Sequence, residues 1–361
     1  MELTFAQKQI VETRKNKVVV VASAAAGKTR CITERVRWLL NNNYDPKKIV
    51  AITFTNAAAE EISIRLNNPK DVFIGTVHSL ANRLLIQGGI DTTHLLKTEK
   101  FDDLFPLIEE FPECIPEIEH LIVDEAQDSN NLQFSFFLDI LKPKNYMLVG
   151  DHRQSIYRFA SSNPDFLVEL MDEPGVTTYD LNENFRNGYK ILDYARSLIA
   201  PLGYKYRDES VAMRNFSGEV LTVECSYHGI AKTIQRRIKN GEDIYNDWFI
   251  LTRTNRELDE VRIVLNKYGI PNDTFKRAFL DNKGLEEKMQ ENSVKVITIH
   301  TSKGLEAKNV IVIGANFLDV EERCLSYVAA TRARDLLVWT YRRNRPIFTR
   351  KAPQIETCNW E

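Results

Sequence analysis

The sequence has few cysteines, almost no net charge and no long apolar run. Its five cysteines form no CxxC pair, which argues against a zinc site or a disulfide framework and favours reduced thiols inside a cell. A formal net charge of −2 excludes a uniformly basic surface, so any nucleic-acid contact has to be a local groove. No apolar run approaches the length of a membrane span, and the N-terminus carries no secretory apolar segment. We therefore expect a cytoplasmic protein.

The sequence does contain apolar runs that alternate with helical patterns. At 361 residues, with 43% hydrophobic and 27% charged residues, the chain is long enough for two globular domains. The alternation starts again near residue 176, which predicts parallel sheets covered by helices on both faces. We expect an α/β protein with two doubly wound domains, at 1–175 and 176–345, followed by an irregular tail at 346–361.

The apolar periodicity also predicts where the individual elements lie. Strands are expected at 17–22, 48–54, 71–75, 119–124, 145–150, 176–181, 219–224, 247–252, 294–299, 308–313 and 335–341. Helices are expected at 28–41, 56–67, 78–87, 130–141, 187–199, 229–239, 255–268 and 321–332.

The stretch KVVVVASAAAGKTR predicts a phosphate-binding loop. Four valines indicate a buried strand, small residues follow, and Gly27, Lys28 and Thr29 open an expected helix. In that order, backbone N–H groups can surround a phosphate, the lysine reaches the β- and γ-phosphates, and the threonine hydroxyl binds Mg²⁺. The strict pattern GxxxxGK[ST] has a glycine where this chain has Ala22. A purely structural turn therefore stays an alternative for this stretch alone.

The stretch LIVDEAQD predicts the acidic half of such a site. An apolar strand would deliver Asp124 and Glu125 at its carboxyl end, where Asp124 can hold Mg²⁺ and Glu125 can polarise an attacking water. The alternative, a strand that ends in a solvated acidic turn, is common for an isolated pair of acids. Behind a candidate phosphate loop, the ATPase interpretation is favoured.

The stretch LVGDHRQSIYRF follows a third expected strand. Gln154 stands where a strand-end amide can sense a γ-phosphate. Tyr157 and Phe159 stand beside Arg153 and Arg158, a combination suited to stacking on bases and neutralising a nucleic-acid backbone. Packing of the two aromatic rings in a core is an equally good interpretation.

Two arginines of the second half stand where arginine fingers could act. Arg186 follows an expected strand, and Arg332 belongs to SYVAATRARD, which predicts a helix through this arginine. Both lie outside the phosphate-loop domain, as fingers that reach across an interdomain cleft require. A solvated arginine is the ordinary alternative for either one.

Taken together, these stretches resemble superfamily 1 DNA helicases of the UvrD/Rep type. The matching motifs run in that family's order: LTFAQ, ASAAAGKT, AITFTNAAAEEI, GTVHS, DEAQD, GDHRQSIYRF, NFR, TIHTSKGLE and YVAATRAR. The resemblance implies two tandem RecA-like domains with an ATP cleft between them. It also implies an ATP hydrolase and DNA helicase.

The resemblance implies a site for ATP and Mg²⁺. ATP would contact Gln7, Ala22, Ser23, Ala24, Ala25, Ala26, Gly27, Lys28, Thr29, Arg30, Phe185 and Glu306. In that set Gln7 would read the adenine edge, Phe185 would stack on the ring, and Glu306 would lie near the ribose. Mg²⁺ would be held by Thr29 and Asp124. The catalytic residues would be Lys28, Glu125, Gln154, Arg186 and Arg332.

The resemblance also implies a track for single-stranded DNA. Its residues would be Phe54, Thr55, Asn56, Thr76, His78, Tyr157, Phe159 and His300. That set suits stacking and phosphate contacts better than reading of base edges, so we expect binding without sequence preference. The implied partners are single-stranded DNA and tailed duplex DNA, with movement from 3′ to 5′.

The chain departs from the family pattern in the phosphate loop. Ala25 and Ala26 replace the usual glycine and the usual serine or threonine. Because a Cβ atom at position 25 disfavours positive φ, we expect ATP binding with weakened affinity. Ala57 replaces a lysine that is usual in TFTNKAA, and Phe159 stands where tryptophan is common.

The chain also lacks room for the accessory subdomains of full-length family members. Only residues 80–123 separate GTVHS from DEAQD, and only residues 187–297 separate NFR from TIHTSKGLE. Three interpretations stay open. The chain is a DNA translocase and helicase, a DNA-stimulated ATPase subunit of a larger protein complex that does not unwind alone, or, less favoured, an RNA helicase.

Overall fold

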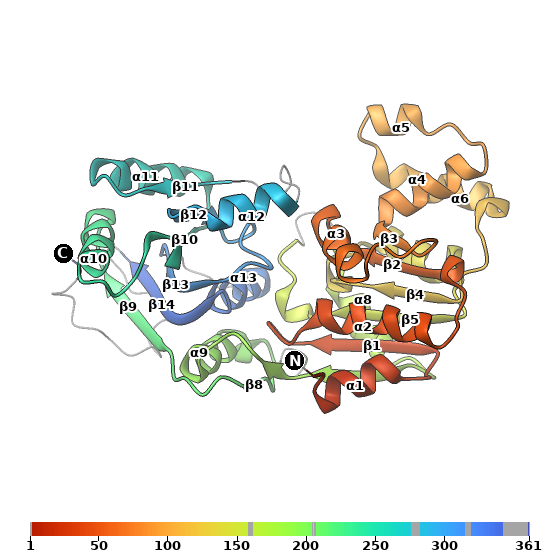
Figure 1. Cartoon of the computed structure of the whole chain (residues 1–361), viewed down its shortest axis with the longest axis horizontal. Coiled ribbons are helices and arrows are strands. Elements are labelled where there is room, and N and C mark those ends of the chain that lie inside the picture. Colours follow the sequence, from red (N-terminus) through yellow and green to blue (C-terminus); the bar gives the residue numbers. More distant parts are fainter. Residues whose placement is uncertain are drawn as a thin grey trace. The chain divides into compact units, whose positions relative to one another are not determined.

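The computed structural model shows a sheet of buried parallel strands in each half of the chain (Figure 1). The structure describes residues 2–157, 162–203, 205, 207–275, 282–314, 319–341 and 360. They form two units, residues 1–181 and 182–361, each with a six-stranded sheet. The prediction of an α/β protein with parallel sheets is confirmed.

The sheet of the first unit is parallel throughout. Its strands, in spatial order, are β3 (Phe73–Thr76), β2 (Ile49–Thr53), β4 (His120–Val123), β5 (Asn145–Gly150), β1 (Lys17–Ala22) and β6 (Thr177–Leu181). Strands β4, β5 and β1 are consecutive neighbours in this order. The loops that follow these three strands therefore leave the sheet side by side.

Helices cover both faces of this sheet. One face carries α1 (Phe5–Glu12), α2 (Lys28–Asn41) and α3 (Asn56–Arg65). The other carries α4 (Val77–Gln87), α6 (Leu104–Glu110), α7 (Asn131–Ser135) and α8 (Pro164–Met171), and α5 (Thr93–Lys97) precedes α6. Val18 and Val20 of β1 join the core under α2, whereas Val19 joins the opposite core. Because successive side chains of a strand point to opposite faces, the run of valines contributes side chains to both cores.

The second unit repeats this architecture. The strand order is β11 (Asn272–Asp273), β12 (Val294–Thr298), β10 (Trp248–Thr252), β13 (Ala307–Val312), β14 (Ala333–Tyr341) and β9 (Glu219–Glu224), all parallel. Helices α10 (Tyr227–Lys239) and α11 (Asn255–Lys267) share one core with the sheet. Helix α9 (Tyr189–Ile199) contacts β9, β14 and α13 (Val320–Ala330). The remaining elements are α12 (Asn282–Gln290) and the small parallel pair β7 (Glu183–Asn184) and β8 (Val211–Ala212).

Each strand and helix expected from the sequence is present, and the structure adds elements that the periodicity did not predict. The helix expected at 130–141 divides into α7 and a π-helical segment, Phe136–Ile140. Helices α1, α8 and α12 and the short strands β7, β8 and β11 were not predicted, whereas α5 and α6 lie at 80–117, where a helix or two was expected. Most of these elements are too short to show a clear period.

The structure divides the chain after residue 181 instead of residue 175. The strand expected at 176–181 was assigned to the second domain, but β6 pairs with β1 in the first sheet, with Val18 opposite Thr177. The tail expected at 346–361 lies outside the described residues, apart from Trp360, which is buried in the core shared by α10 and α11.

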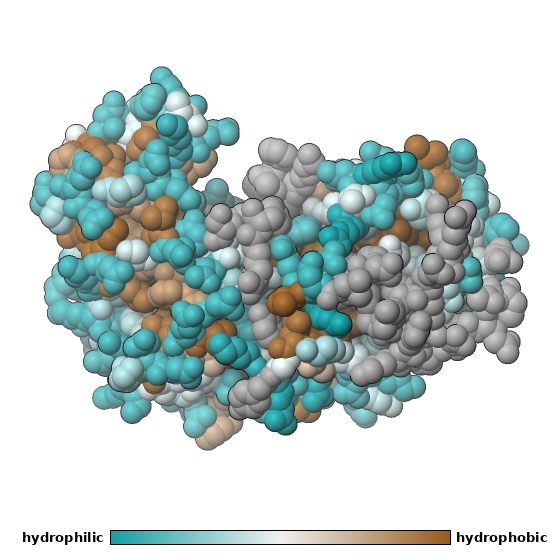
Figure 2. Space-filling view, turned by 180° about the vertical axis from the view of Figure 1, so that it is seen from behind, coloured by the Kyte–Doolittle hydropathy of each residue, from teal (hydrophilic) through white to brown (hydrophobic). Residues whose placement is uncertain are grey.

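Hydrophilic side chains cover most of the face seen in Figure 2, and apolar side chains lie there in separate patches. Among the described residues, no helix is both long enough and apolar enough to cross a membrane.

Arg35 and His120 are titratable side chains that are buried in the first unit, away from the phosphate loop. Arg35 donates hydrogen bonds to the carbonyl oxygens of Val11 and Thr13, at 2.8 and 2.7 Å. His120 begins β4, lies edge-on to Tyr44, and its Nε2 has no hydrogen-bond partner among the described residues. Burial, together with the charge of Arg35, lowers the pKa of His120 to about 4.

This histidine predicts a pH-dependent loss of stability. An unfolded histidine takes up a proton near pH 6.5, whereas the folded pKa of His120 is about 4. A depressed folded pKa means that stability is full above the unfolded pKa and falls as the pH drops from about 6.5 to about 4, by on the order of 3 kcal/mol in all. In urea unfolding, wild type should therefore lose more stability between pH 7.5 and pH 5 than His120→Phe, by about 2 kcal/mol. Replacement of the exposed His94 by Gln is the matched control, and equal losses in wild type and His120→Phe would refute the prediction.

Candidate nucleotide and nucleic-acid site

The three loops predicted to carry the chemistry meet at one edge of the first sheet. They follow β1, β4 and β5, which are adjacent and parallel. The carboxyl ends of parallel strands form the usual ligand-binding edge of such a sheet. The sequence motifs are thereby brought together by the strand order.

The phosphate loop connects β1 to α2 through two left-handed residues. Ala25 has φ 57° and Gly27 has φ 82°. Gly27 precedes the first helical residue, Lys28, and no side chain caps the start of α2. A Cβ atom at Gly27 would lie 2.9 Å from Nε2 of Gln7, so this position also requires the absence of a side chain. The free helix start suits a phosphate group, because its N–H groups need an acceptor.

Gln7 supports the phosphate loop from α1. Its side chain is buried, and its Nε2 donates a hydrogen bond to the carbonyl oxygen of Ala26 at 3.2 Å. Its Oε1 accepts a hydrogen bond from the backbone N–H of Thr4, which forms part of the capping box of α1. Gln7 therefore lies beside the loop, and its contact with adenine stays a prediction.

Lys28 and Glu125 face each other across the ends of β1 and β4. Lys28 Nζ lies 3.2 Å from Glu125 Oε1, and both side chains are mostly buried. Glu125 itself has φ 49°, a left-handed conformation that is costly for a residue with a side chain. The backbone N–H of Glu125 donates to Oδ1 of Asp124 at 2.9 Å. The expected acidic pair thus lies next to the expected lysine.

Gln127 connects this acid to the next loop, a role that sequence reasoning missed. Its Nε2 donates to Glu125 Oε2 at 2.6 Å, and its Oε1 accepts from the backbone N–H of Asp151 at 2.9 Å. Gln127 is completely buried, and a Cβ atom at Gly150 would come within 2.5 Å of its Oε1. The sequence signal that could have revealed this role is the glutamine among the acidic residues of DEAQD.

Asp151 anchors the loop after β5. Its Oδ1 accepts from Arg153 Nε at 2.6 Å, and its Oδ2 accepts from Gln154 Nε2 at 2.7 Å. Burial alone would raise the pKa of Asp151, but the charges of Arg153, His152 and Lys28 hold it below its usual value. The carboxylate therefore stays ionised within the site.

Arg153 differs from the expectation. Neutralisation of a nucleic-acid backbone was one of two equally good interpretations of its stretch, but the side chain of Arg153 is only 2% exposed and its Nη2 donates to Ser23 Oγ at 3.0 Å. Arg153 therefore holds the phosphate loop and is not available at the surface. Spacing could not reveal this, because the contact joins residues that are far apart in the sequence.

The predicted arginine fingers and their neighbours lie together in the second unit. Arg186 Nε lies 2.5 Å from Glu306 Oε2, and Arg186 Nη1 donates to the carbonyl oxygen of Thr331 at 3.1 Å. Phe185 is 38% exposed, which leaves its ring accessible. Burial would raise the pKa of Glu306, but Arg186, followed by Arg334 and Arg332, holds it below its usual value.

Arg332 does not lie on a helix. Helix α13 ends at Ala330, and Arg332 belongs to the connection to β14. Its side chain is 2% exposed, with Nε donating to the carbonyl oxygen of Val328 at 2.9 Å and Nη1 to that of Leu305 at 3.3 Å. The helix expected at 321–332 therefore ends two residues early, at Ala330, and β14 starts at Ala333, two residues before the strand expected at 335–341.

Several residues of the expected DNA track lie beyond the ends of β2 and β3, on the same edge as the phosphate loop. Phe54 is 47% exposed and stacks on Tyr157, with ring centroids 5.4 Å apart and an interplanar angle of 25°. Thr55 caps α3, where Asn56 is the first residue, and Thr76 caps α4. A stacked aromatic pair with the exposed ring of Phe54, beside hydroxyl groups, suits base stacking and phosphate contacts.

His78, His300 and Phe159 complete that predicted set. His78 Nε2 lies 2.8 Å from Asp102 Oδ1, and its ring stacks on Phe105. His300 follows β12 in the second unit. Phe159, together with Arg158, lies outside the described residues. The DNA-binding role of the whole set stays a prediction.

The oxygen donors of the site fit Mg²⁺ held together with a nucleotide. No group of three or more His, Cys, Asp or Glu side chains within the described ranges could hold a metal ion by itself. Mg²⁺ usually takes only one or two protein ligands and completes its shell with phosphate and water. The hydroxyl of Thr29 and the carboxylate of Asp124 are ligands of that kind. These features, with the loop between β1 and α2, are those of a phosphate-loop fold.

Comparison with known proteins gives the family. The model of the UvrD/REP helicase N-terminal domain matches residues 3–110 and 111–174, and the model of the UvrD-like helicase C-terminal domain matches residues 272–344. The chain belongs to the UvrD/REP helicase family.

Curated relatives agree with this assignment. The chain is 26% identical to ATP-dependent DNA helicase Rep of Buchnera aphidicola subsp. Acyrthosiphon pisum (strain APS), over 80% of this chain and 60% of that protein. It is 25% identical to ATP-dependent DNA helicase PcrA of Leuconostoc citreum, over 73% of this chain and 48% of that protein. It is 23% identical to DNA helicase II of Escherichia coli (strain K12), over 92% of this chain and 59% of that protein. The chain thus spans about half to three fifths of the length of these relatives.

The left-handed Ala25 generates a stability prediction. A left-handed conformation costs alanine about 1–2 kcal/mol, whereas a new glycine costs about 0.4–1 kcal/mol through the unfolded chain. Ala25→Gly should therefore leave the free energy of unfolding unchanged or raise it by up to about 1 kcal/mol. The control Ala24→Gly, in the same loop but without positive φ, should lower it by about 0.4–1 kcal/mol. Urea unfolding compares the two variants, and equal destabilisation by both would show that Ala25 carries no strain.

Proposed function

We propose that the chain is an ATP-dependent motor that moves along single-stranded DNA from 3′ to 5′ and separates duplex strands. The observation that carries the proposal is the 3.2 Å pair of Lys28 and Glu125, between the phosphate loop and the acidic strand end. Lys28 would hold the phosphates, Thr29 and Asp124 would hold Mg²⁺, and Glu125 would activate the water. In these roles the bound Mg²⁺ would neutralise charge that develops on the phosphates. The printed names of the relatives as ATP-dependent DNA helicases support the same activity.

The remaining polar residues of the site take roles that follow from their positions. Gln154 is held by Asp151 at the end of β5 and would contact the γ-phosphate. Arg186 and Arg332, in the second unit, would contact the same phosphate if the two units close on ATP. Phe185 would stack on adenine, Gln7 would read its edge, Arg30 would assist there, and Glu306 would lie near the ribose.

The loop after β5 would couple ATP to DNA. Gln154 and Tyr157 are three positions apart in that loop, and Tyr157 stacks on Phe54. A shift of Gln154 with the γ-phosphate would therefore move one ring of the aromatic pair. Such movement changes the stacking surface offered to a base.

The short connection between β3 and β4 favours a second candidate function. This internal connection contains only α4, α5, α6 and short 3₁₀ turns among its described residues, so it has little room for an accessory subdomain. We infer as the alternative that the protein is a DNA-stimulated ATPase subunit that needs a protein partner to unwind DNA. An RNA helicase is the weaker alternative, because the relatives are named as DNA helicases.

ATP hydrolysis tests the site directly. Glu125→Gln should lower DNA-stimulated ATPase turnover by about 10²–10⁴-fold, since it removes the group that accepts a proton from water. Lys28→Ala should abolish hydrolysis because it removes the phosphate contact. Glu109→Gln, an exposed acid on α6, is the matched control and should keep full activity. Full activity of Glu125→Gln, or no stimulation by single-stranded DNA, would overturn the proposal.

Unwinding separates the two candidate functions. Purified protein should separate a duplex with a 3′ single-stranded tail and leave a 5′-tailed duplex paired. DNA-stimulated ATPase activity without unwinding of either substrate would instead favour the subunit. Equal-length DNA and RNA oligonucleotides in the same ATPase assay should show stimulation by DNA, and stronger stimulation by RNA would favour the RNA helicase.

A further inference from the structure

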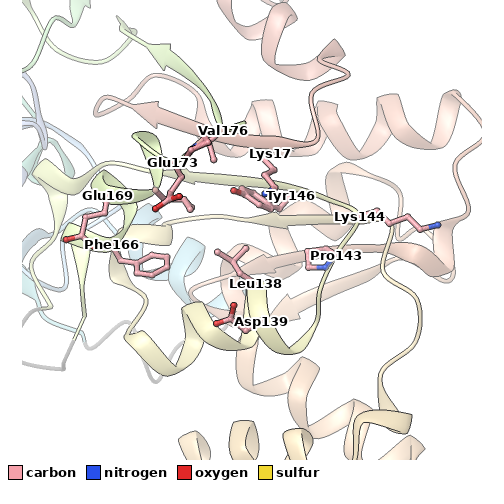
Figure 3. A pocket seen from close by; sticks show the side chains of 12 residues that line it. Lys17, Leu138, Asp139, Pro143, Lys144, Tyr146, Phe166, Glu169, Glu173 and Val176 are labelled. Carbon is pink, nitrogen blue, oxygen red and sulfur yellow. The ribbon is translucent and has the colours of Figure 1, made fainter.

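A pocket lies in the first unit, at the edge of the sheet opposite the phosphate loop. It has a volume of about 450 Å³. Lys17 is the first residue of β1, Tyr146 belongs to the start of β5, and Val176 immediately precedes β6 (Figure 3). Since the strands are parallel, their starts lie away from the carboxyl ends that carry the nucleotide site. This volume is in the range of protein pockets that bind ligands.

Apolar side chains line much of this pocket. They are Leu138, Pro143, Phe166, Leu170, Pro174 and Val176. Leu138 belongs to the π-helical segment, whereas Phe166 and Leu170 belong to α8. π-Helical turns are rare and are found frequently at functional sites.

The rim of the pocket has an excess of carboxylates. Asp139, Glu169 and Glu173 line it and form no ion pair among the described residues. Lys144 lines it too but pairs with Glu117, which is not a lining residue. Figure 3 shows Glu169 and Glu173 on the side of the pocket away from Lys144. With Lys144 paired to Glu117, Lys17 is left among the lining residues to balance three carboxylates, so the pocket rim carries an excess of negative charge.

A polar group inside the pocket lacks a hydrogen-bond partner. The side chain of Tyr146 is 9% exposed, and its hydroxyl makes no hydrogen bond with the described residues. Burial, followed by the negative charge of Glu173, raises the pKa of Tyr146. Figure 3 shows Tyr146 reaching toward Glu173, with Leu138 and Phe166 on the other side of the cavity. The hydroxyl is neutral and can accept a hydrogen bond from a cationic donor.

We propose that this pocket is a docking site for an arginine side chain of a partner protein. The aliphatic stem of an arginine would lie along Leu138 and Leu170, as such stems cover apolar surface. Its planar guanidinium would stack on Phe166, donate to the Tyr146 hydroxyl and pair with Glu173. A guanidinium suits this combination better than an ammonium, because it stacks on aromatic rings and donates several hydrogen bonds in fixed directions. The proposal is independent of the proposed ATPase function, because the pocket lies at the other edge of the sheet.

Binding of a defined peptide tests the proposal. The probe is a fluorescein-labelled, acetylated and amidated pentapeptide with sequence Gly-Leu-Arg-Leu-Gly, measured by fluorescence polarisation with the full chain. Matched peptides carry lysine or citrulline at the centre. We expect saturable binding of the arginine peptide and at least about tenfold weaker binding of the other two, as for loss of hydrogen bonds to a charged group.

Two variants locate the binding on the pocket. Tyr146→Phe removes only a hydroxyl without a protein partner, so it should fold normally and weaken the arginine peptide several-fold. Glu173→Gln should weaken it by about tenfold through loss of the carboxylate. Glu110→Gln, an exposed acid on α6, is the control for general charge, and thermal unfolding checks the fold of each variant.

Three outcomes would overturn the proposal. They are absence of binding, equal binding of the arginine and lysine peptides, and binding that neither pocket variant changes. Self-association in sedimentation that Tyr146→Phe and Glu173→Gln abolish would instead make a second copy of the chain the occupant. DNA-stimulated ATPase activity should be the same in both pocket variants. Failure of this proposal therefore leaves the test of the proposed function unaffected.

Discussion

The buried carboxylate of Asp151 is the group on which the geometry of the nucleotide site depends. A buried charge is costly unless charged and hydrogen-bonding groups surround it. Arg153 supplies the charge and also reaches Ser23 in the phosphate loop. The backbone N–H of Asp151 donates to Gln127, which in turn holds Glu125. The loops after β1, β4 and β5 therefore move together or leave buried polar groups unpaired.

Backbone strain accompanies this network. Ala25 and Glu125 both have positive φ, at 57° and 49°; Ala25 lies three residues before Lys28 in the phosphate loop, and Glu125 pairs with Lys28. Such conformations cost of order 1–3 kcal/mol each and persist only where the surroundings over-determine them. The network around Asp151 provides that constraint. Two of the eight described non-glycine residues with positive φ thus lie at the candidate site, where phosphate would be held and water activated.

Much of the fold could be predicted because buried parallel strands have a simple pattern. The valines of β1 pack into cores on both faces of the sheet, so this strand appears in the sequence as an uninterrupted apolar run. The loop at Gly27 and Lys28 could be predicted for the same local reason, since glycine and small residues permit the turn. The pairing of β6 could not, because its residues, TTYDL, suit an edge strand of either domain and only its partner β1 decides. The end of α13 before Arg332 was also missed, because β14 competes for the same residues.

Local patterns in the chain are sufficient for the class of fold, for most of the order of strands and helices, and for the residue types of the phosphate loop and its acidic partner. These properties depend on periodicity and on neighbouring residues. Packing settles which strands become neighbours, that Arg153 is buried against Ser23, and that Tyr146 lines a pocket at the opposite edge of the sheet. Contacts between residues far apart in the chain follow from strand order and packing, which no local pattern encodes.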